Sequence, residues 1–142
     1  MNKKFTAKAS TTIHAPASNV WDAITKPELI KQYMFGTDVI TDWKVGHPII
    51  YRGEWQGKPF EDKGKVLKVE PEKRLVSTHW SPLSGVSDTP ENHHTVAYEL
   101  SEKDGGTEVT ITQDNNATEE EKNESEQNWS TMLAKLKEIL EK

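Results

Sequence analysis

Apolar or small side chains alternate with polar ones near the start of the chain, at Phe5, Ala7, Ala9, Thr11 and Ile13. A period of two is typical of a strand that buries one face, so the pattern predicts a strand over residues 5–13. From residue 16 onward the apolar spacing lengthens to that of a helix. We therefore expect one strand followed by helical structure.

Two prolines, Pro16 and Pro27, divide the helical segment. Proline is well tolerated in the first turn of a helix, because its missing N–H would have no partner there, so each proline predicts a helix start. The two apolar stripes that follow are Ala17, Val20, Trp21 and Ile24, and then Leu29, Ile30, Tyr33 and Met34. Gly36 is expected to end the second helix, since glycine adopts the left-handed conformation of a helix end without strain.

From residue 37 to residue 113 the chain reads as a series of strands. β-Branched and aromatic residues alternate with polar ones and are interrupted by Gly, Pro and Asp. The predicted strands cover residues 38–43, 48–55, 59–69, 74–80, 93–101 and 107–113. Turns are expected at residues 56–58, 70–73 and 104–106. Residues 81–92 form the one long loop, either a functional lid or a plain surface excursion.

The clearest element is a long helix at the end of the chain. Thr118 and Glu121 have the spacing of a capping box, in which each residue's side chain binds a free backbone N–H at the helix start. The apolar positions that follow lie on one helical face and are Trp129, Met132, Leu133, Leu136 and Leu140. The first half, residues 119–128, has no such stripe. We therefore expect packing mainly through the second half.

A single long helix can bury its stripe against about seven strands only if the sheet curls around it. The helix would be about 36 Å long, nearly matched by strands of roughly ten residues. The predicted fold is an α+β helix-grip fold with element order β-α-α-β6-α. One domain is expected over residues 1–142.

Composition narrows the class of protein. The hydrophobic share is only 33%, but the net charge is −5 and there are five Trp, three Tyr and three Phe, so a folded domain is expected rather than a disordered chain. An isoelectric point near 5.6 argues against binding nucleic acid. No apolar run approaches the roughly 20 residues needed to cross a bilayer, so no membrane insertion is expected. The chain has no cysteine, and we expect it in the cytoplasm.

Motifs for cofactors and metals are missing from the sequence. There is no glycine-rich phosphate loop and no H-E-x-x-H pair. His93 and His94 are adjacent on a predicted strand and would face opposite sides, so they are not expected to share a metal. Neither a cofactor nor a metal site is therefore expected. Asp62 shares strand parity with Phe60, and it is either a carboxylate facing inward, able to act as an acid, or a solvated residue near a turn.

Several strings along the chain are shared with a known family. They include VWDAITKPELIKQYMFG at residues 20–36, GKVLKVEPEKRLVSTHW at 64–80, GGTEVTIT at 105–112 and NWSTMLAKLKEIL at 128–140. The chain resembles the activator of heat shock protein 90 ATPase-like family, within the START and birch-pollen-allergen-like (SRPBCC) helix-grip superfamily. One departure is His47, which stands in the turn of DWKVGHPI where a second glycine is usual.

The resemblance implies a space between sheet and helix in which relatives carry lipids, hormones or polyketides. It places Tyr33 and Phe35 near the mouth of that space. Strand alternation, read with the resemblance, predicts the remaining lining residues. They are Tyr51, Trp55, Phe60, Thr78, Trp80, Val96, Tyr98 and Gln113 on the strands, and Trp129, Met132 and Leu133 on the helix. The same residues would also suit a filled core, and Gln113 would then need a polar partner.

Three functions are compatible with this pattern. The leading hypothesis is non-enzymatic binding of a hydrophobic or aromatic small molecule, as a carrier or sensor. The alternative is a module that binds a chaperone, as the family name suggests. The third is an enzyme that uses Asp62, Tyr51 or Tyr98 as an acid on a ligand in the same space.

Overall fold

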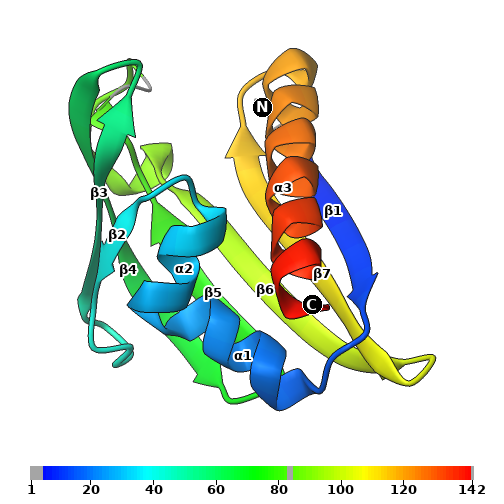
Figure 1. The fold of residues 1–142 in the computed structure, drawn as a ribbon. Helices are drawn as coiled ribbons and strands as arrows, with labels where there is room; N and C mark the ends of the chain where they lie inside the picture. Colours follow the sequence, from blue (N-terminus) through cyan, green and yellow to red (C-terminus); the bar gives the residue numbers. More distant parts are fainter. Residues whose placement is uncertain (1–4, 83–84, 142) are drawn as a thin grey trace.

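The computed structural model describes residues 5–82 and 85–141, apart from the side chain of Trp55. The predicted order β-α-α-β6-α is confirmed in these residues (Figure 1). The elements are β1 (Phe5–Ile13), α1 (Ala17–Thr25), α2 (Pro27–Tyr33), β2 (Asp38–Ile40), β3 (Pro48–Trp55), β4 (Lys58–Glu70), β5 (Arg74–His79), β6 (His94–Lys103), β7 (Gly106–Asn116) and α3 (Glu119–Leu140).

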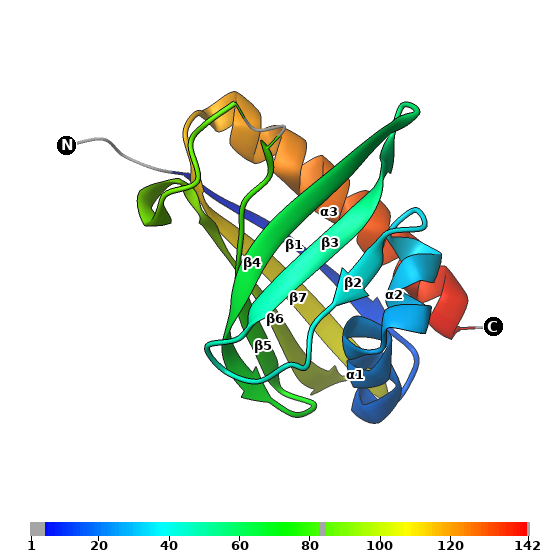
Figure 2. The same cartoon turned by 90° about the vertical axis from the view of Figure 1, so that its left-hand side faces the viewer.

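The strands form one antiparallel sheet in the order β1-β7-β6-β5-β4-β3-β2. The sheet curves strongly, so that α3 lies along β1 and β7 while β2, β3 and β4 stand on the far side of the interior (Figures 1 and 2). Helices α1 and α2 cover one end. The predicted curled sheet around a long helix is therefore confirmed.

Helix α3 begins and packs as its sequence predicts. The hydroxyl of Thr118 accepts a hydrogen bond of 3.0 Å from the backbone N–H of Glu121. The buried residues of the helix are Met132, Leu133 and Leu136, all in its second half. The polar first half is exposed or half-buried because it carries no apolar stripe.

Strand β2 ends at Ile40, three residues earlier than predicted. The chain turns away because Trp43 adopts a positive φ of 58° and its ring N–H donates to the carbonyl of Thr25 over 2.7 Å. The turn that follows is held by Asp42, whose carboxylate lies 2.7 Å from Nδ1 of His47. The histidine that departs from the family pattern thus has a partner within its own turn.

Trp80, which follows β5, packs against residues that precede β6 in the chain. The ring of Trp80 stacks on His93, with ring centres 6.5 Å apart, and its N–H donates to the carbonyl of Val86. Asp88 binds both His93 and Lys63. His94 points elsewhere and contacts the carbonyl of Asp114. The two adjacent histidines therefore have separate partners.

Candidate functional site

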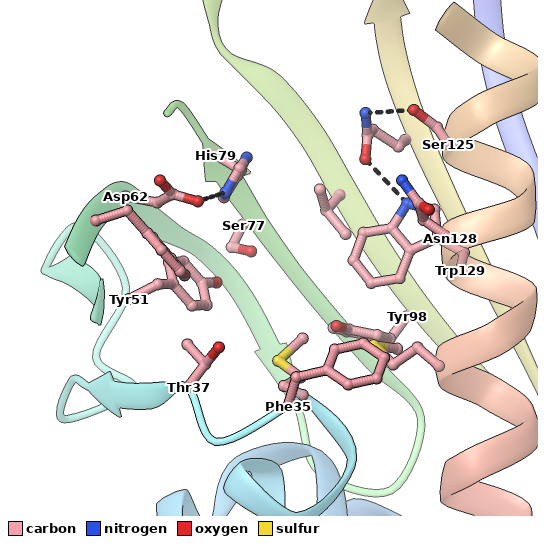
Figure 3. Close-up of a pocket in the computed structure, with 15 residues that line it drawn as sticks. Phe35, Thr37, Tyr51, Asp62, Ser77, His79, Tyr98, Ser125, Asn128 and Trp129 are labelled. Carbon is pink, nitrogen blue, oxygen red and sulfur yellow. Dashed lines mark hydrogen bonds and ion pairs between the residues drawn. The ribbon is translucent and has the colours of Figure 1, made fainter. Parts of the chain in front are cut away.

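A cavity of about 300 Å³ lies between the concave face of the sheet and residues 125–132 of α3 (Figure 3). Its walls come from the turn after α2, from β3 to β7 and from α3, and they are mainly apolar. The predicted residues that line it are Phe35, Tyr51, Phe60, Val96, Tyr98, Gln113, Trp129 and Met132. That they bind a ligand remains a prediction.

Seven lining residues were not predicted as ligand contacts: Met34, Thr37, Asp62, Ser77, His79, Ser125 and Asn128. The sequence had left two orientations for the side chain of Asp62, toward the interior or toward solvent. The structure places it toward the interior. Ser125 and Asn128 lie in the polar first half of α3, for which the sequence predicted no apolar packing stripe. No periodicity marks such residues, since a cavity wall tolerates polar groups that a packed core would exclude.

The prediction that Thr78 and Trp80 face the cavity is wrong. Val96 of β6 pairs with Ser77 of β5, so the inward side chains of β5 are those in step with Ser77, including His79. The prediction rested on alternation and on the resemblance, whereas the ring of Trp80 stacks on His93 and donates to the carbonyl of Val86. A shift of one residue moves every side chain of a strand to the other face.

Three other predicted residues do not contribute to the described walls. Tyr33 is buried beneath the cavity, where its hydroxyl donates to the carbonyl of Ala23 over 2.7 Å. Leu133 is 1% exposed and belongs to the packed core. The side chain of Trp55 lies outside the described part of the chain.

The wall formed by β7 and α3 is held by a hydrogen-bond network. The amide of Gln113 donates to Asn116 and Ser125 over 3.1 and 3.2 Å, and its oxygen accepts from the ring N–H of Trp129 over 2.9 Å. Tyr98 packs edge-on against the ring of Trp129. The side-chain oxygen and nitrogen of Gln113 therefore both have hydrogen-bond partners, although the residue lies at an apolar position of the strand. These bonds also fix the position of Trp129.

The opposite wall carries Asp62 and His79 (Figure 3). Nε2 of His79 lies 3.0 Å from Oδ2 of Asp62. The rings of Tyr51 and His79 pack edge-on, with their centres 5.5 Å apart. The other carboxylate oxygen of Asp62 is buried and has no hydrogen-bond partner among the described residues. The carboxylate therefore depends on His79 as its polar partner.

Tyrosine hydroxyls complete the polar lining. Burial raises the pKa of Tyr51 to about 12, an effect that a hydrogen bond with Ser77 partly offsets and the charge of Asp62 reinforces. Burial also raises the pKa of Tyr98 well above its usual value, as do the neighbouring hydroxyls of Tyr33 and Tyr51. These hydroxyls stay protonated at neutral pH, so they can donate hydrogen bonds into the cavity.

Phe35 stands at the rim of the cavity. It is 77% exposed and adopts a positive φ of 54°, which is uncommon for an aromatic residue. Gly36 follows with a φ of 82°, so the two residues turn the chain sharply after α2. The turn brings the ring of Phe35 to the wall of the cavity (Figure 3).

Two features would point to other functions, a cluster of metal ligands and a membrane-spanning helix. No group of three or more His, Asp or Glu side chains within residues 5–82 and 85–141 is arranged to hold a metal ion. No helix of the described chain is both long enough and apolar enough to span a bilayer.

Comparison with known proteins places the chain in a family. The pattern of the activator of Hsp90 ATPase homolog 1-like proteins matches residues 14–141. The solution structure of ChR145 from Cytophaga hutchinsonii is 50% identical, covers 99% of this chain and 97% of its own, and superposes with a TM-score of 0.86. No curated protein matches the sequence.

More distant structures share the fold. The Aha1 dimer from Colwellia psychrerythraea is 21% identical, with 96% of both chains covered and a TM-score of 0.74. Protein CV1439 from Chromobacterium violaceum is 18% identical, with 96% of this chain and 97% of its own covered and a TM-score of 0.78. The matched pattern and the half-identical relative extend over almost the whole chain, and the chain belongs to the family of activator of Hsp90 ATPase homolog 1-like proteins.

Proposed function

We propose that the protein binds a hydrophobic or aromatic small molecule in the cavity between the sheet and α3, as a carrier or sensor that does not transform it. The observation that carries the proposal is the cavity of about 300 Å³ itself. Its apolar walls supply binding free energy, and a few fixed polar groups supply orientation. Concave sites of this size and composition are typical of small-molecule binding.

The competing view, a filled core, is disfavoured by the size of the space. Packed interiors leave few voids larger than a single water molecule, which occupies roughly 10–15 Å³ on a comparable measure. Core residues such as Leu75, Ile111 and Leu133 are nearly inaccessible to solvent. A space of about 300 Å³ beside a core that is otherwise closely packed supports a binding site.

The test uses N-phenyl-α-naphthylamine, an apolar probe whose fluorescence rises when it leaves water. It should bind at one saturable site and quench or enhance tryptophan emission, because Trp129 forms part of the wall. At about a hundred times its dissociation constant the probe should stabilise the fold by about 2.7 kcal/mol. For a domain of this size the melting temperature should rise by about 5–10 °C.

A bulky substitution separates cavity binding from binding elsewhere. Val96→Trp should fill the space and abolish probe binding, since Val96 is 5% exposed and lines the cavity. Val45→Trp adds the same ring at a position that is 64% exposed and away from the cavity, so it should leave binding unchanged. Binding that survives Val96→Trp, or an absence of saturable binding in the unmodified protein, would refute the proposal.

The chaperone-binding alternative makes a different prediction. A co-chaperone should stimulate the ATPase of Hsp90, and Val96→Trp should leave that stimulation intact because a surface contact does not need the cavity. Native mass spectrometry of gently purified protein would report a retained small molecule directly. A bound hydrophobic adduct without ATPase stimulation supports the binding function.

A further inference from the structure

One ring nitrogen of His79, a residue that lines the cavity, has no hydrogen-bond partner among the described residues. Its Nε2 lies 3.0 Å from Oδ2 of Asp62. In the tautomer that carries its proton on Nε2, the imidazole donates to this oxygen, and Nδ1 is an acceptor. No described residue of the chain donates to Nδ1. The side chain is 31% exposed and lines the cavity, so a ligand can reach it (Figure 3).

Asp62 holds His79 in this state. The side chain of Asp62 is 15% exposed, and its second oxygen is buried without a partner, so the carboxylate gains its stabilisation mainly from the histidine. Tyr51 of β3 packs edge-on against the imidazole ring. These two contacts fix both the tautomer and the orientation of the ring, in the way that a carboxylate orients an imidazole toward another partner.

The charge of the walls selects among ligands. Among the described residues that line the cavity, one is a carboxylate and none is a lysine or an arginine. An anionic ligand would lose its hydration next to Asp62 with no lysine or arginine among these residues to replace it. An organic cation would also lose its hydration, while one oxygen of Asp62 is taken by His79 and the other is enclosed. The walls therefore favour a neutral ligand.

A neutral ligand can satisfy Nδ1 only with a hydrogen-bond donor. An O–H on an unsaturated carbon is a stronger donor than an alcohol, and it belongs to the flat, unsaturated bodies that pack well against aromatic walls such as Tyr51, Phe60 and Trp129. The protonated hydroxyls of Tyr51 and Tyr98 are donors, so they suit an acceptor oxygen on the same molecule.

We propose that the ligand is a neutral aromatic compound bearing a phenolic or enolic hydroxyl, that this hydroxyl donates its hydrogen bond to Nδ1 of His79, and that Asp62 is the positioning residue. The inference rests on the proposed binding function and names the class of molecule that the cavity recognises. It assigns to the polar end of the cavity a selectivity that apolar burial by itself does not give.

The test compares four ligands with one ring system by isothermal titration calorimetry. They are β-naphthol, its methyl ether, naphthalene carboxylate and naphthylmethylammonium. β-Naphthol should bind about tenfold more tightly than the ether, which has the same rings but no donor. The two charged compounds should bind more weakly than the ether. No lysine or arginine among the described lining residues can pair with the carboxylate, and the oxygens of Asp62 are either bound to His79 or enclosed and so cannot pair with the ammonium.

Two variants assign the preference to His79. His79→Phe keeps a flat ring but has no acceptor nitrogen, so the ratio of the affinities for β-naphthol and its ether should fall to about one. His93→Phe is the matched control, since His93 forms a similar pair with Asp88 at 2.7 Å outside the cavity. It should leave the tenfold preference intact. Nitrogen-15 NMR of histidine should also show the Nδ1 resonance of His79 shifting when β-naphthol binds.

The outcomes separate the two proposals. Equal binding of β-naphthol and its ether, or a preference that survives His79→Phe, overturns the hydroxyl assignment and leaves the binding function standing. Tighter binding of either charged compound overturns the neutral-ligand argument. Failure of all four compounds to bind overturns the ligand class, whereas the binding function is decided separately by the probe and Val96→Trp. If His79→Phe does not fold, the ether comparison and the nitrogen resonance of the unmodified protein still decide.

Discussion

Replacing Leu136 by alanine should lower the free energy of unfolding by about 3–4 kcal/mol. The side chain is fully buried on α3. The change removes three carbon atoms, worth about 2.4 kcal/mol at roughly 0.8 kcal/mol for each buried methylene. A sealed void of about 50 Å³ would add about 1 kcal/mol at roughly 24 cal/mol per Å³. The tight packing around Leu136 leaves little room for neighbours to close the gap.

Met132→Ala is the informative comparison, because it also removes three non-hydrogen atoms from a buried position of the same helix. Met132 is 4% exposed but borders the existing cavity. Its truncation enlarges a space that is already present, so the cost should stay near the lower end for such changes, about 2 kcal/mol. Glu124→Ala, on the exposed polar half of α3, should change the stability by no more than about 0.5 kcal/mol.

Urea unfolding followed by far-ultraviolet circular dichroism would give the three free energies by linear extrapolation. The order expected is Leu136→Ala, then Met132→Ala, then Glu124→Ala. A cost for Met132→Ala equal to or above that of Leu136→Ala would mean that Met132 lies in a packed core, and the cavity argument would fail. A small cost at Leu136 would show that the second half of α3 does not carry the packing.

Two further predictions concern buried groups in the sheet. Because burial raises the pKa of Tyr51 to about 12, the stability that its neutral hydroxyl contributes is complete below about pH 10 and is lost as the pH rises through about 12. Tyr51→Phe should therefore lose less stability between these pH values, by up to about 1.4 kcal/mol per pH unit, measured from urea midpoints. An unchanged pH profile would contradict the burial of this hydroxyl. Gly64→Ala should lower the free energy of unfolding by about 1–3 kcal/mol or more, because a methyl group there would overlap the backbone carbonyl of Thr78. The change would be measured as a lower melting temperature. An unchanged melting temperature would show that β4 and β5 do not approach so closely.

Local patterns in the sequence determined most of the secondary structure. Period-two alternation located β1, and helical spacing with a capping pair at Thr118 located α3, because both signals arise from neighbours in the chain. Errors fell where a distant contact decided the outcome. The strand predicted over residues 38–43 ends early because Trp43 finds the carbonyl of Thr25, and β7 runs on to Asn116, whose amide donates to the carbonyl of Phe5.

The face of β5 shows why the site was harder to predict than the fold. Both faces of β5 carry residues that could be buried, so its sequence did not indicate whether Ser77 or Thr78 faces inward. Pairing between Ser77 and Val96 decided it, and that register depends on a neighbouring strand. The inward position of His79 beside Asp62 follows from the same register.

The sequence by itself determined an amphipathic helix, a set of strands and the family to which they belong, since these depend on residue types and their spacing. Only the tertiary structure decided that the space between them holds a cavity. Whether apolar side chains meet or leave room depends on sheet curvature and on the distance of α3 from β3 and β4, to which residues from seven separate segments contribute. The polar pair at its wall exists only because β4 and β5 lie side by side, and it is that arrangement in space which gives the cavity its chemistry.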